Sequence, residues 1–384
     1  MSLLDAVLAL PLGALVLAGL GYTLAAAEMT RRALRAGSRG SRAAPSVSLL
    51  KPLHGADPGL FEALESFCLQ DYPGEVEIVF GVHQISDPAV RVVEALRAAH
   101  PQMSIKLVAD EADHGANRKV SNLINIAREA TNAILVISDA DIVVPRHYLR
   151  RLLDALNQPG AGAVSCLYVG RVHDGAGARL PATLSAMGID YQFLPGVAVG
   201  RALGLAEPCF GSTIALDRRI LDQIGGFEAI ADHLADDYEI GRRVRALGLR
   251  LAIPPMVVEH ICAEASLGEW FSHELRWART VRQIDPVGHA GSVLTHVLPL
   301  ALLSALAAGF PLWSLGLVLA SLLVRIILKI RVDASTGGRA GPLWLLPLRD
   351  ILSFGVFLGS FAVNTVGWRG QRFKVDAHGA LRED

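Results

Sequence analysis

Hydrophobic residues gather in a few long runs near the two ends of the chain. The first run covers residues 6–27, and about 20 apolar residues are enough for a helix to cross a bilayer core. Acidic Asp5 precedes this run and arginines follow it, whereas a cleaved signal peptide carries its basic residues first. The positive-inside rule therefore predicts an uncleaved anchor with its N-terminus outside and the following residues in the cytoplasm. The arginines are Arg31, Arg32, Arg35, Arg39 and Arg42.

The other apolar runs lie in the C-terminal part of the chain. Runs 293–310 and 312–330 meet at Pro311, which predicts a tight hairpin of two membrane helices. Run 351–366 is shorter, and we expect a last spanning or interfacial helix there. With the N-terminal anchor, these runs predict a multi-pass protein of the cell inner membrane, with the loop 329–339 on the cytoplasmic side.

Short strand-like segments alternate with helical segments between the membrane runs. The expected strands are 47–50, 76–82, 105–109 and 134–138, and the expected helices are 59–69, 89–99 and 120–130. This alternation predicts an α/β domain with a parallel sheet and helices on both faces. The predicted parts are an anchor (1–30), a basic linker (31–45), a cytoplasmic catalytic domain (46–289), a membrane region (290–368) and a tail (369–384).

Composition excludes several classes of protein. Hydrophobic residues make up 52% of the chain, and the formal net charge of −1 gives no basic surface for a nucleic-acid partner. The four cysteines form no C-x-x-C pair, so neither a structural zinc nor a disulfide framework is expected. No G-x-G-x-x-G follows the first strand and no Walker-type sequence occurs, which argues against dinucleotide oxidoreductases and P-loop ATPases.

Asp139 and Asp141 form a D-x-D pattern where the strand 134–138 ends. Ligands of open α/β sheets bind beyond the carboxyl ends of the strands. Two carboxylates at this spacing can face one Mg²⁺ or Mn²⁺, directly or through water, and such a cation bridges a diphosphate. About one such pattern is expected by chance, and a solvated turn is the alternative interpretation.

Other polar residues are candidates for the same chemistry. Asp236 and Asp237 open a helix predicted over 238–247, either as ordinary caps or with one of them as a general base. Lys51 ends the first strand, Asp87 follows the second, and Lys119 stands before a helix, where it can meet phosphate.

A helix is predicted after Leu267, and His273 and Arg276 share one of its faces. Arginine suits a departing diphosphate, and Trp277 can stack on a ligand or anchor the helix at a membrane surface. The alternative is a purely amphipathic interfacial helix.

Taken together, the stretch 48–58, Asp87, the D-x-D at Asp139, Asp237 with Tyr238, and Arg276 with Trp277 resemble the ceramide glucosyltransferase family. The resemblance covers the whole chain and implies a cytosolic, Rossmann-like GT-A domain that uses a UDP-sugar, a divalent cation and a membrane lipid acceptor. It implies catalytic roles for Asp237 as base, Arg276 and Trp277, and a metal at Asp139 and Asp141. Substrate contacts are assigned to Lys51, Asp87, Lys119, Asp139, Asp236 and His273.

Three stretches, 114–123, 209–213 and 273–280, look most like the bacterial hopanoid-biosynthesis-associated branch. This resemblance implies inverting transfer of N-acetylglucosamine to a bacteriohopanetetrol-type lipid. The apolar stretch 180–205 is interpreted as a lip against the bilayer where the lipid enters, or else as a core segment or a peripheral helix. His273 departs from the family, which has Gln or Arg there. Alternatives are a ceramide glucosyltransferase and a polysaccharide synthase, although a synthase needs more spans for its channel.

Overall fold

The computed structural model describes residues 3–35, 44–173, 179–207, 209–338, 340–362, 365–368, 371–375 and 381–383. The chain divides into two compact units. The helical unit comprises Met1–Arg35, Gly177–Ala206 and Glu264–Arg372, and the sheet unit comprises Ala36–Ala176, Glu207–Ala263 and Phe373–Asp384. Residues 179–206 and 264–289, which we expected in the catalytic domain, therefore pack with the helices.

The sheet unit contains a seven-stranded sheet with the order β3-β2-β1-β4-β8-β6-β9. The strands are β1 (Val47–Pro52), β2 (Val76–Val82), β3 (Ser104–Ala109), β4 (Ile134–Ile137), β6 (Ala161–Ser165), β8 (Ile214–Asp217) and β9 (Arg250–Ala252). Strands β1 to β4 are parallel, as predicted, but β8 is antiparallel to both of its neighbours. The prediction of a wholly parallel sheet is wrong because residues 209–213 cross the carboxyl edge before β8, which must start there and run back.

A smaller sheet lies in the same unit. It consists of β5 (Ile142–Val143), β7 (Leu167–Val172) and β10 (Val257–Cys262). Strand β10 is parallel to β7 and antiparallel to β5. Since β5 begins directly after the D-x-D pattern, this pairing brings β10 beside that pattern.

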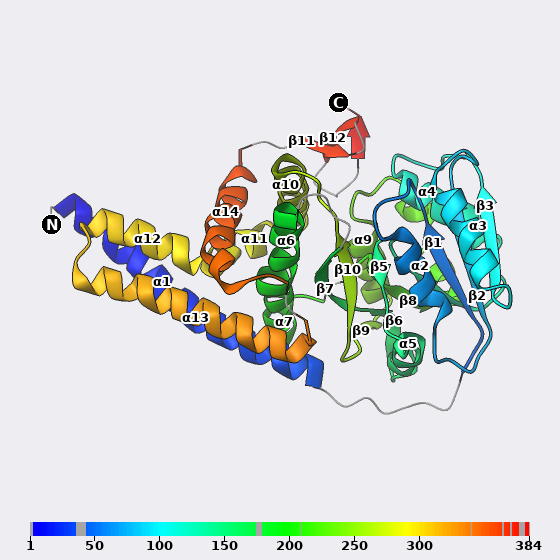
Figure 1. Ribbon diagram of the computed structural model, residues 1–384, viewed down its shortest axis with the longest axis horizontal. Coiled ribbons are helices and arrows are strands. Elements are labelled where there is room, and N and C mark those ends of the chain that lie inside the picture. The colour runs from blue at the N-terminus through cyan, green and yellow to red at the C-terminus, as the bar shows by residue number, and fades with distance from the viewer. Residues whose placement is uncertain are drawn as a thin grey trace. The chain divides into compact units, whose positions relative to one another are not determined.

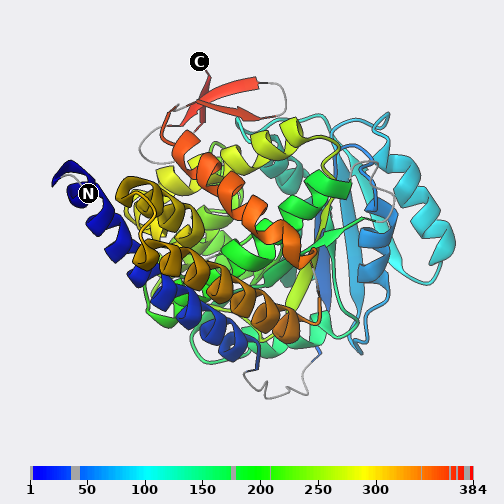
Figure 2. The same ribbon diagram turned by 60° about the vertical axis from the view of Figure 1, so that its left-hand side comes forward.

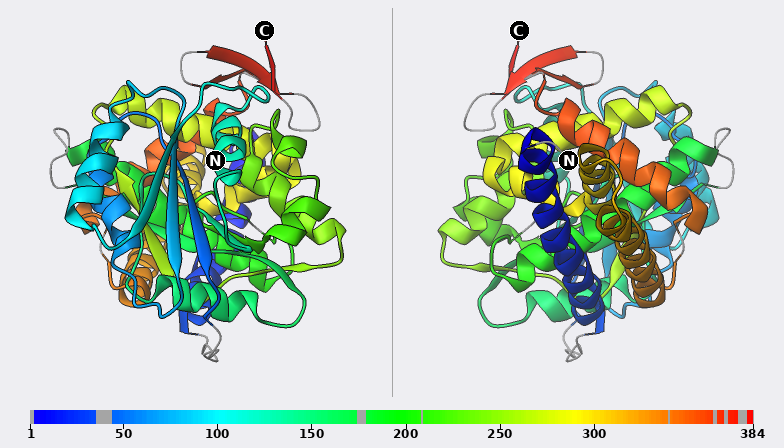
Figure 3. Two further views of the ribbon diagram at one scale, coloured as in Figure 1. Left: turned by 90° about the vertical axis from the view of Figure 1, so that its right-hand side faces the viewer. Right: turned by 90° about the vertical axis from the view of Figure 1, so that its left-hand side faces the viewer.

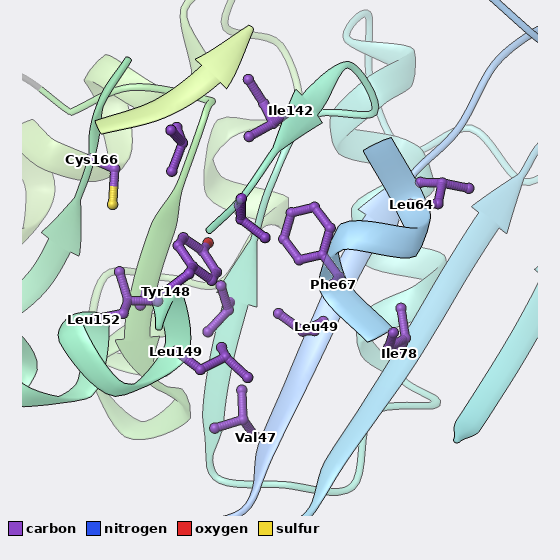
Figure 4. Packing of buried hydrophobic residues seen from close by; sticks show 14 of the residues in the cluster. Val47, Leu49, Leu64, Phe67, Ile78, Ile142, Tyr148, Leu149, Leu152 and Cys166 are labelled. Carbon is purple, nitrogen blue, oxygen red and sulfur yellow. The ribbon is translucent and has the colours of Figure 1, made fainter. Parts of the chain in front are cut away.

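Helices cover both faces of the large sheet (Figures 1 and 3). They are α2 (Leu60–Cys68), α3 (Ala89–Ala99), α4 (Arg118–Ala127), α5 (Tyr148–Leu156), α8 (Arg218–Gln223) and α9 (Asp236–Ala246). Leu49 belongs to the cluster formed with α2, α3 and α5 on one face, and Figure 4 shows its α2 and α5 side chains. The next residue, Leu50, packs with α4 and α9 on the other face. This alternation with a period of two is the reason for the continuously apolar strands.

The helical unit is built from eight α-helices among the residues described (Figures 1 and 2). They are α1 (Leu3–Arg35), α6 (Arg179–Gly188), α7 (Leu194–Ala202), α10 (Leu267–Ile284), α11 (Pro286–Gly291), α12 (Val297–Ala308), α13 (Leu312–Thr336) and α14 (Leu346–Gly359). A π-helical turn, Ile189–Phe193, joins α6 to α7. Most of the stretch 180–205 is thus helical. Three short strands follow, β11 (Thr365–Trp368), β12 (Gln371–Val375) and β13 (Leu381–Glu383).

The membrane prediction is met in part. Of the described helices, Ala9–Arg35 alone is long and apolar enough to cross a bilayer by itself. Pro286–Thr295 and Val297–Ala308 qualify together as a second span, but they are bent by 68°. Helices α12 and α13 form the hairpin predicted at Pro311 and pack against α1. Arg39 and Arg42 lie outside the described residues.

Two expected boundaries are wrong. Helix α13 continues to Thr336, so 329–336 is not a loop. The helix tolerates Lys329 because its ammonium pairs with Asp333 at 2.9 Å and meets the Tyr191 hydroxyl at 2.6 Å. Helix α14 ends at Gly359, so the run 351–366 is not one helix.

Candidate active site

Lys119 is the centre of an acidic cluster at the carboxyl edge of the large sheet. Its Nζ lies 2.7 Å from Asp139 Oδ1 and 3.0 Å from Asp236 Oδ2. Although burial lowers the pKa of Lys119, the neighbouring carboxylates raise it above its usual value, so the side chain is cationic. The structure therefore joins three predicted residues that stand far apart in the sequence.

The start of α4 explains this position of Lys119. Asn117 caps the helix, because its Oδ1 accepts a hydrogen bond from the Val120 N–H at 3.2 Å. Its amide group donates to the His233 carbonyl at 2.7 Å, and its backbone N–H donates to the Ala231 carbonyl. The segment before α9 is thereby tied to the start of α4, which brings Lys119 next to Asp236.

Gly211 links Asp139 to Asp237. The Gly211 N–H donates to Asp237 Oδ2 at 2.9 Å, and its carbonyl accepts from the Asp139 N–H at 3.1 Å. A Cβ atom on this residue would lie 2.5 Å from Asp139 Oδ2, so only glycine fits. The sequence analysis gave Gly211 no role, although it stands within the stretch 209–213.

Asp237 has the electrostatics of a proton acceptor. Burial and the charge of Asp236 raise its pKa to about 6. The Tyr238 N–H also donates to Asp237 Oδ1 at 2.7 Å, and together with Gly211 it fixes the orientation of the carboxylate. A carboxylate with this pKa is ionised at neutral pH and is more basic than a solvated one.

Lys51, near the end of β1, contacts the backbone of the cluster at Asp139. Its side chain is fully buried, lies 3.9 Å from the Phe67 ring centre and donates to the Asp139 carbonyl at 2.6 Å. Burial lowers the pKa of Lys51 to about 7, against the effect of Asp141 and Asp139. Because it is enclosed, Lys51 positions the strand end, and its contact with the substrate stays a prediction.

Asp141 has a different partner from Asp139. Its Oδ1 lies 3.5 Å from His260 Nδ1, and within the part of the chain that the structure describes no donor forms a hydrogen bond with this oxygen. His260 was not identified from the sequence, because only the pairing of β10 with β5 brings it to Asp141.

The aspartates of the D-x-D pattern supply some, but not all, of the ligands that a divalent cation needs. Among the described residues, no three His, Cys, Asp or Glu side chains converge on a metal-sized site. Asp139 Oδ1 is paired with Lys119, whereas Asp141 Oδ1 accepts no hydrogen bond. A cation here would take one or two ligands from this chain and the others from phosphate and water, as Mg²⁺ does at nucleotide sites.

Asp87 organises a loop at the same edge. Its carboxylate accepts from the Gly55 N–H at 2.9 and 3.1 Å and from the Ala89 N–H at 2.9 Å. His54 Nδ1 lies 3.5 Å from it. Asp87 thus ties the loop after β1 to the start of α3, and its contact with the substrate stays a prediction.

His273, Arg276 and Trp277 all lie on α10 of the helical unit. His273 Nδ1 is 2.9 Å from Glu264 Oε1, and the His273 and Trp277 rings are 4.5 Å apart. The expected helix is confirmed, while the roles of these residues in catalysis stay predictions.

Comparison with known proteins identifies the family. The chain is 25% identical over 353 residues to ceramide glucosyltransferase 1 of Caenorhabditis elegans, covering 88% of this chain and 73% of that one. It is 25% identical to the probable glycosyltransferase YdaM of Bacillus subtilis, over 61% of this chain and 55% of that one. The fold matches the mannosyltransferase PcManGT of Pyrobaculum calidifontis, solved with GDP-Man and Mn²⁺ (TM-score 0.55, 24% identity, 93% of this chain and 99% of that one).

This likeness confirms the predicted α/β glycosyltransferase fold of the GT-A type. The model of glycosyl transferase family 21 matches residues 12–381, nearly the whole chain. The protein is therefore a member of glycosyl transferase family 21.

Proposed function

We propose that this glycosyltransferase moves a sugar from a UDP-sugar to the hydroxyl of a membrane lipid, with inversion at the anomeric carbon. The observation that carries the proposal is the cluster in which Lys119 meets Asp139 and Asp236, with Asp237 fixed beside them by Gly211. The cluster stands at the carboxyl edge of the sheet, where α/β folds bind their ligands.

The chemistry follows from the charges. Asp237 accepts the proton of the acceptor hydroxyl while its oxygen attacks the anomeric carbon. The bond from that carbon to the diphosphate oxygen breaks in the same displacement, and the product is β-linked. Lys119, with Arg276 as a predicted partner, stabilises the charge on the departing UDP. A divalent cation held by Asp141 and Asp139 would neutralise the diphosphate.

The membrane setting supports a lipid acceptor. Helix α1 is apolar enough to anchor the chain, and the worm relative is named for a lipid substrate, ceramide. We propose an inner-membrane protein whose sheet unit is cytoplasmic. A reporter inserted between β7 and α6 tests this orientation, because a periplasmic reporter would be inactive there if it is correct and active if it is wrong.

For the sugar and the lipid, we propose N-acetylglucosamine and a bacteriohopanetetrol-type hopanoid. The support is the resemblance of stretches 114–123 and 273–280 to the hopanoid-associated branch. Stretch 114–123 contains Lys119 and the start of α4, so it contributes directly to the acidic cluster. The second candidate is glucose transfer to ceramide, which the names of two Caenorhabditis elegans relatives, ceramide glucosyltransferases 1 and 3, favour at least as well.

One experiment separates these candidates. Membranes containing the protein are incubated with labelled UDP-sugars, and the lipid product is identified by mass spectrometry. In a hopanoid-making host, deletion of the gene should remove glucosaminyl-type hopanoids and leave free bacteriohopanetetrol. Unchanged hopanoid glycosides together with a lost glycosylceramide would establish the second candidate instead.

A further inference from the structure

A buried carboxylate stands against His273 in the helical unit. The Glu264 side chain is only 9% exposed, and its Oε1 lies 2.9 Å from His273 Nδ1. The same oxygen accepts a hydrogen bond from the Ser185 hydroxyl of α6 at 2.7 Å. Glu264 precedes α10, and the sequence analysis gave it no role, because only the packing of α6 against α10 completes this contact.

The charge of Glu264 depends on His273. Of the described residues, His273 alone forms an ion pair with Glu264, and the second oxygen, Oε2, is buried and accepts no hydrogen bond from them. Burial raises the pKa of Glu264, but the hydrogen bonds from His273 and Ser185 outweigh burial and keep this pKa below its usual value. The group is therefore a carboxylate at neutral pH.

This carboxylate fixes the orientation of the imidazole. An ionised carboxylate only accepts hydrogen bonds, so the hydrogen between the two side chains belongs to His273 Nδ1. The other ring nitrogen, Nε2, is then left for a second partner. The Trp277 ring lies 4.5 Å from the imidazole, with 65° between the two planes, and restricts its rotation further.

We propose that Glu264 is a positioning residue, which holds His273 so that Nε2 donates a hydrogen bond to a phosphate oxygen of the UDP-sugar. The inference rests on the proposed function, in which α10 also contributes Arg276 to the diphosphate. An imidazole that donates through both nitrogens is positively charged. Glu264 balances this charge and touches no substrate atom, so it acts only through His273.

A double-mutant cycle distinguishes positioning from structural support. Glu264→Gln keeps the size of the side chain but removes its charge, so kcat/KM for the UDP-sugar should fall about tenfold. His273→Gln should lose at least as much. Adding Glu264→Gln to His273→Gln should cause no further loss, because no imidazole remains to be held. Glu264→Asp, which keeps the charge, should retain more activity than Glu264→Gln.

UDP binding to the full chain in detergent, measured by calorimetry, should follow the same pattern. Each single variant should bind UDP more weakly than the wild type, and the double variant should bind it no more weakly than His273→Gln. Glu269→Gln is the matched control. Glu269 is exposed at the same helix start, accepts a hydrogen bond from the Ala265 N–H, and forms no ion pair with His273 among the described residues. This variant should keep the wild-type kcat/KM.

Two results would overturn the inference. They are a wild-type kcat/KM in Glu264→Gln, and a loss of equal size whether residue 273 is histidine or glutamine, which structural support alone would produce. If Glu264→Gln does not fold, Ser185→Ala replaces it in the cycle, since it removes the hydroxyl that holds the same Glu264 oxygen. Its loss should be smaller and should likewise depend on His273, and a loss independent of His273 would again overturn the inference.

The test also separates this inference from the proposed function. A wild type that binds UDP and transfers sugar, but shows no coupling between the two residues, refutes only the role of Glu264. A wild type that neither binds UDP nor transfers sugar refutes the proposed function as well.

Discussion

The two units of the protein both hold buried charges, but they balance them differently. In the helical unit two buried arginines each have their own carboxylate: Arg325 meets Asp350 at 2.6 and 2.8 Å, and Arg349 meets Glu274 at 2.8 Å. In the sheet unit, the Lys119 ammonium group pairs with two carboxylates, those of Asp139 and Asp236. The negative charge of a third, Asp237, also raises the pKa of Lys119.

This difference separates structural charges from functional ones. A buried pair with satisfied hydrogen bonds mainly maintains a packing arrangement, and its loss destabilises the fold. A site with more carboxylates than cations holds unfavourable repulsion, which a bound cation can relieve. Substitutions in the helical unit should therefore affect stability first, and substitutions in the acidic cluster should affect transfer first.

The largest expected effect on activity is that of Asp237→Asn. The variant should bind UDP-sugar but transfer sugar about 10²- to 10⁴-fold more slowly, because the acceptor hydroxyl loses its base. Removal of a repulsive charge stabilises the fold, whereas loss of one of the two acceptor oxygens that face the Gly211 and Tyr238 N–H groups destabilises it, so thermal unfolding is measured alongside transfer. Asp222→Asn, at an exposed position on α8, is the control. A normal transfer rate would mean that another residue is the base, with Asp236 the first to examine.

The largest expected effect on stability is that of Asp350→Asn. It leaves the Arg325 guanidinium buried without its carboxylate, which costs about 3–5 kcal/mol. Thermal unfolding of the detergent-solubilised protein measures this. The double variant Arg325→Met, Asp350→Leu should recover much of the loss, because no unpaired charge remains. An unchanged midpoint in the single variant would show that the pair does not stabilise the unit.

Gly211→Ala should have an intermediate effect. The new methyl group would meet Asp139 Oδ2 at 2.5 Å, so either the carboxylate or the backbone between Asp139 and Asp237 must move. Overpacking of this kind costs about 1–3 kcal/mol. We expect a clear loss of transfer, and Gly291→Ala, where nothing lies within 4 Å and the backbone suits any residue, controls for the loss of a glycine. Wild-type kinetics in Gly211→Ala would contradict the role of this link.

The smallest effect concerns pH. Asp237 must be ionised to accept a proton, and its pKa is about 6, so kcat/KM should rise as the pH passes through 6 and then level off. Asp236→Asn removes a neighbouring negative charge and should lower the pKa of Asp237, which moves this acid limb to lower pH. A pH–rate profile of both proteins measures the shift. A limb that moves to higher pH would contradict the assigned cause.

Local patterns predicted much of the sheet unit. The segment 76–82 was found because every residue of β2 is apolar or small apart from Glu77, and the helix 89–99 because its apolar positions recur with helical spacing. The candidate residues Lys119, Asp139 and Asp236 were also identified from local context, and the structure brings them together.

The missed features all depend on contacts between distant parts of the chain. The direction of β8 follows from the path of 209–213 over the sheet edge, and His260 reaches Asp141 only through the pairing of β10 with β5. Helix α13 was expected to end early because its charges look unsuited to an apolar helix. The Tyr191 hydroxyl, which contacts both Lys329 and Asp333, comes from another segment that no local pattern connects to it.

The account depends most on the claim that the acidic cluster works with a divalent cation. The direct test is sugar transfer by membranes stripped of metal with EDTA and then supplied with Mn²⁺ or Mg²⁺. Activity should be lost in EDTA and should return when a divalent cation is added. Full turnover by the metal-stripped enzyme would contradict the account, because the carboxylates at Asp139 and Asp141 would then have no cation to hold.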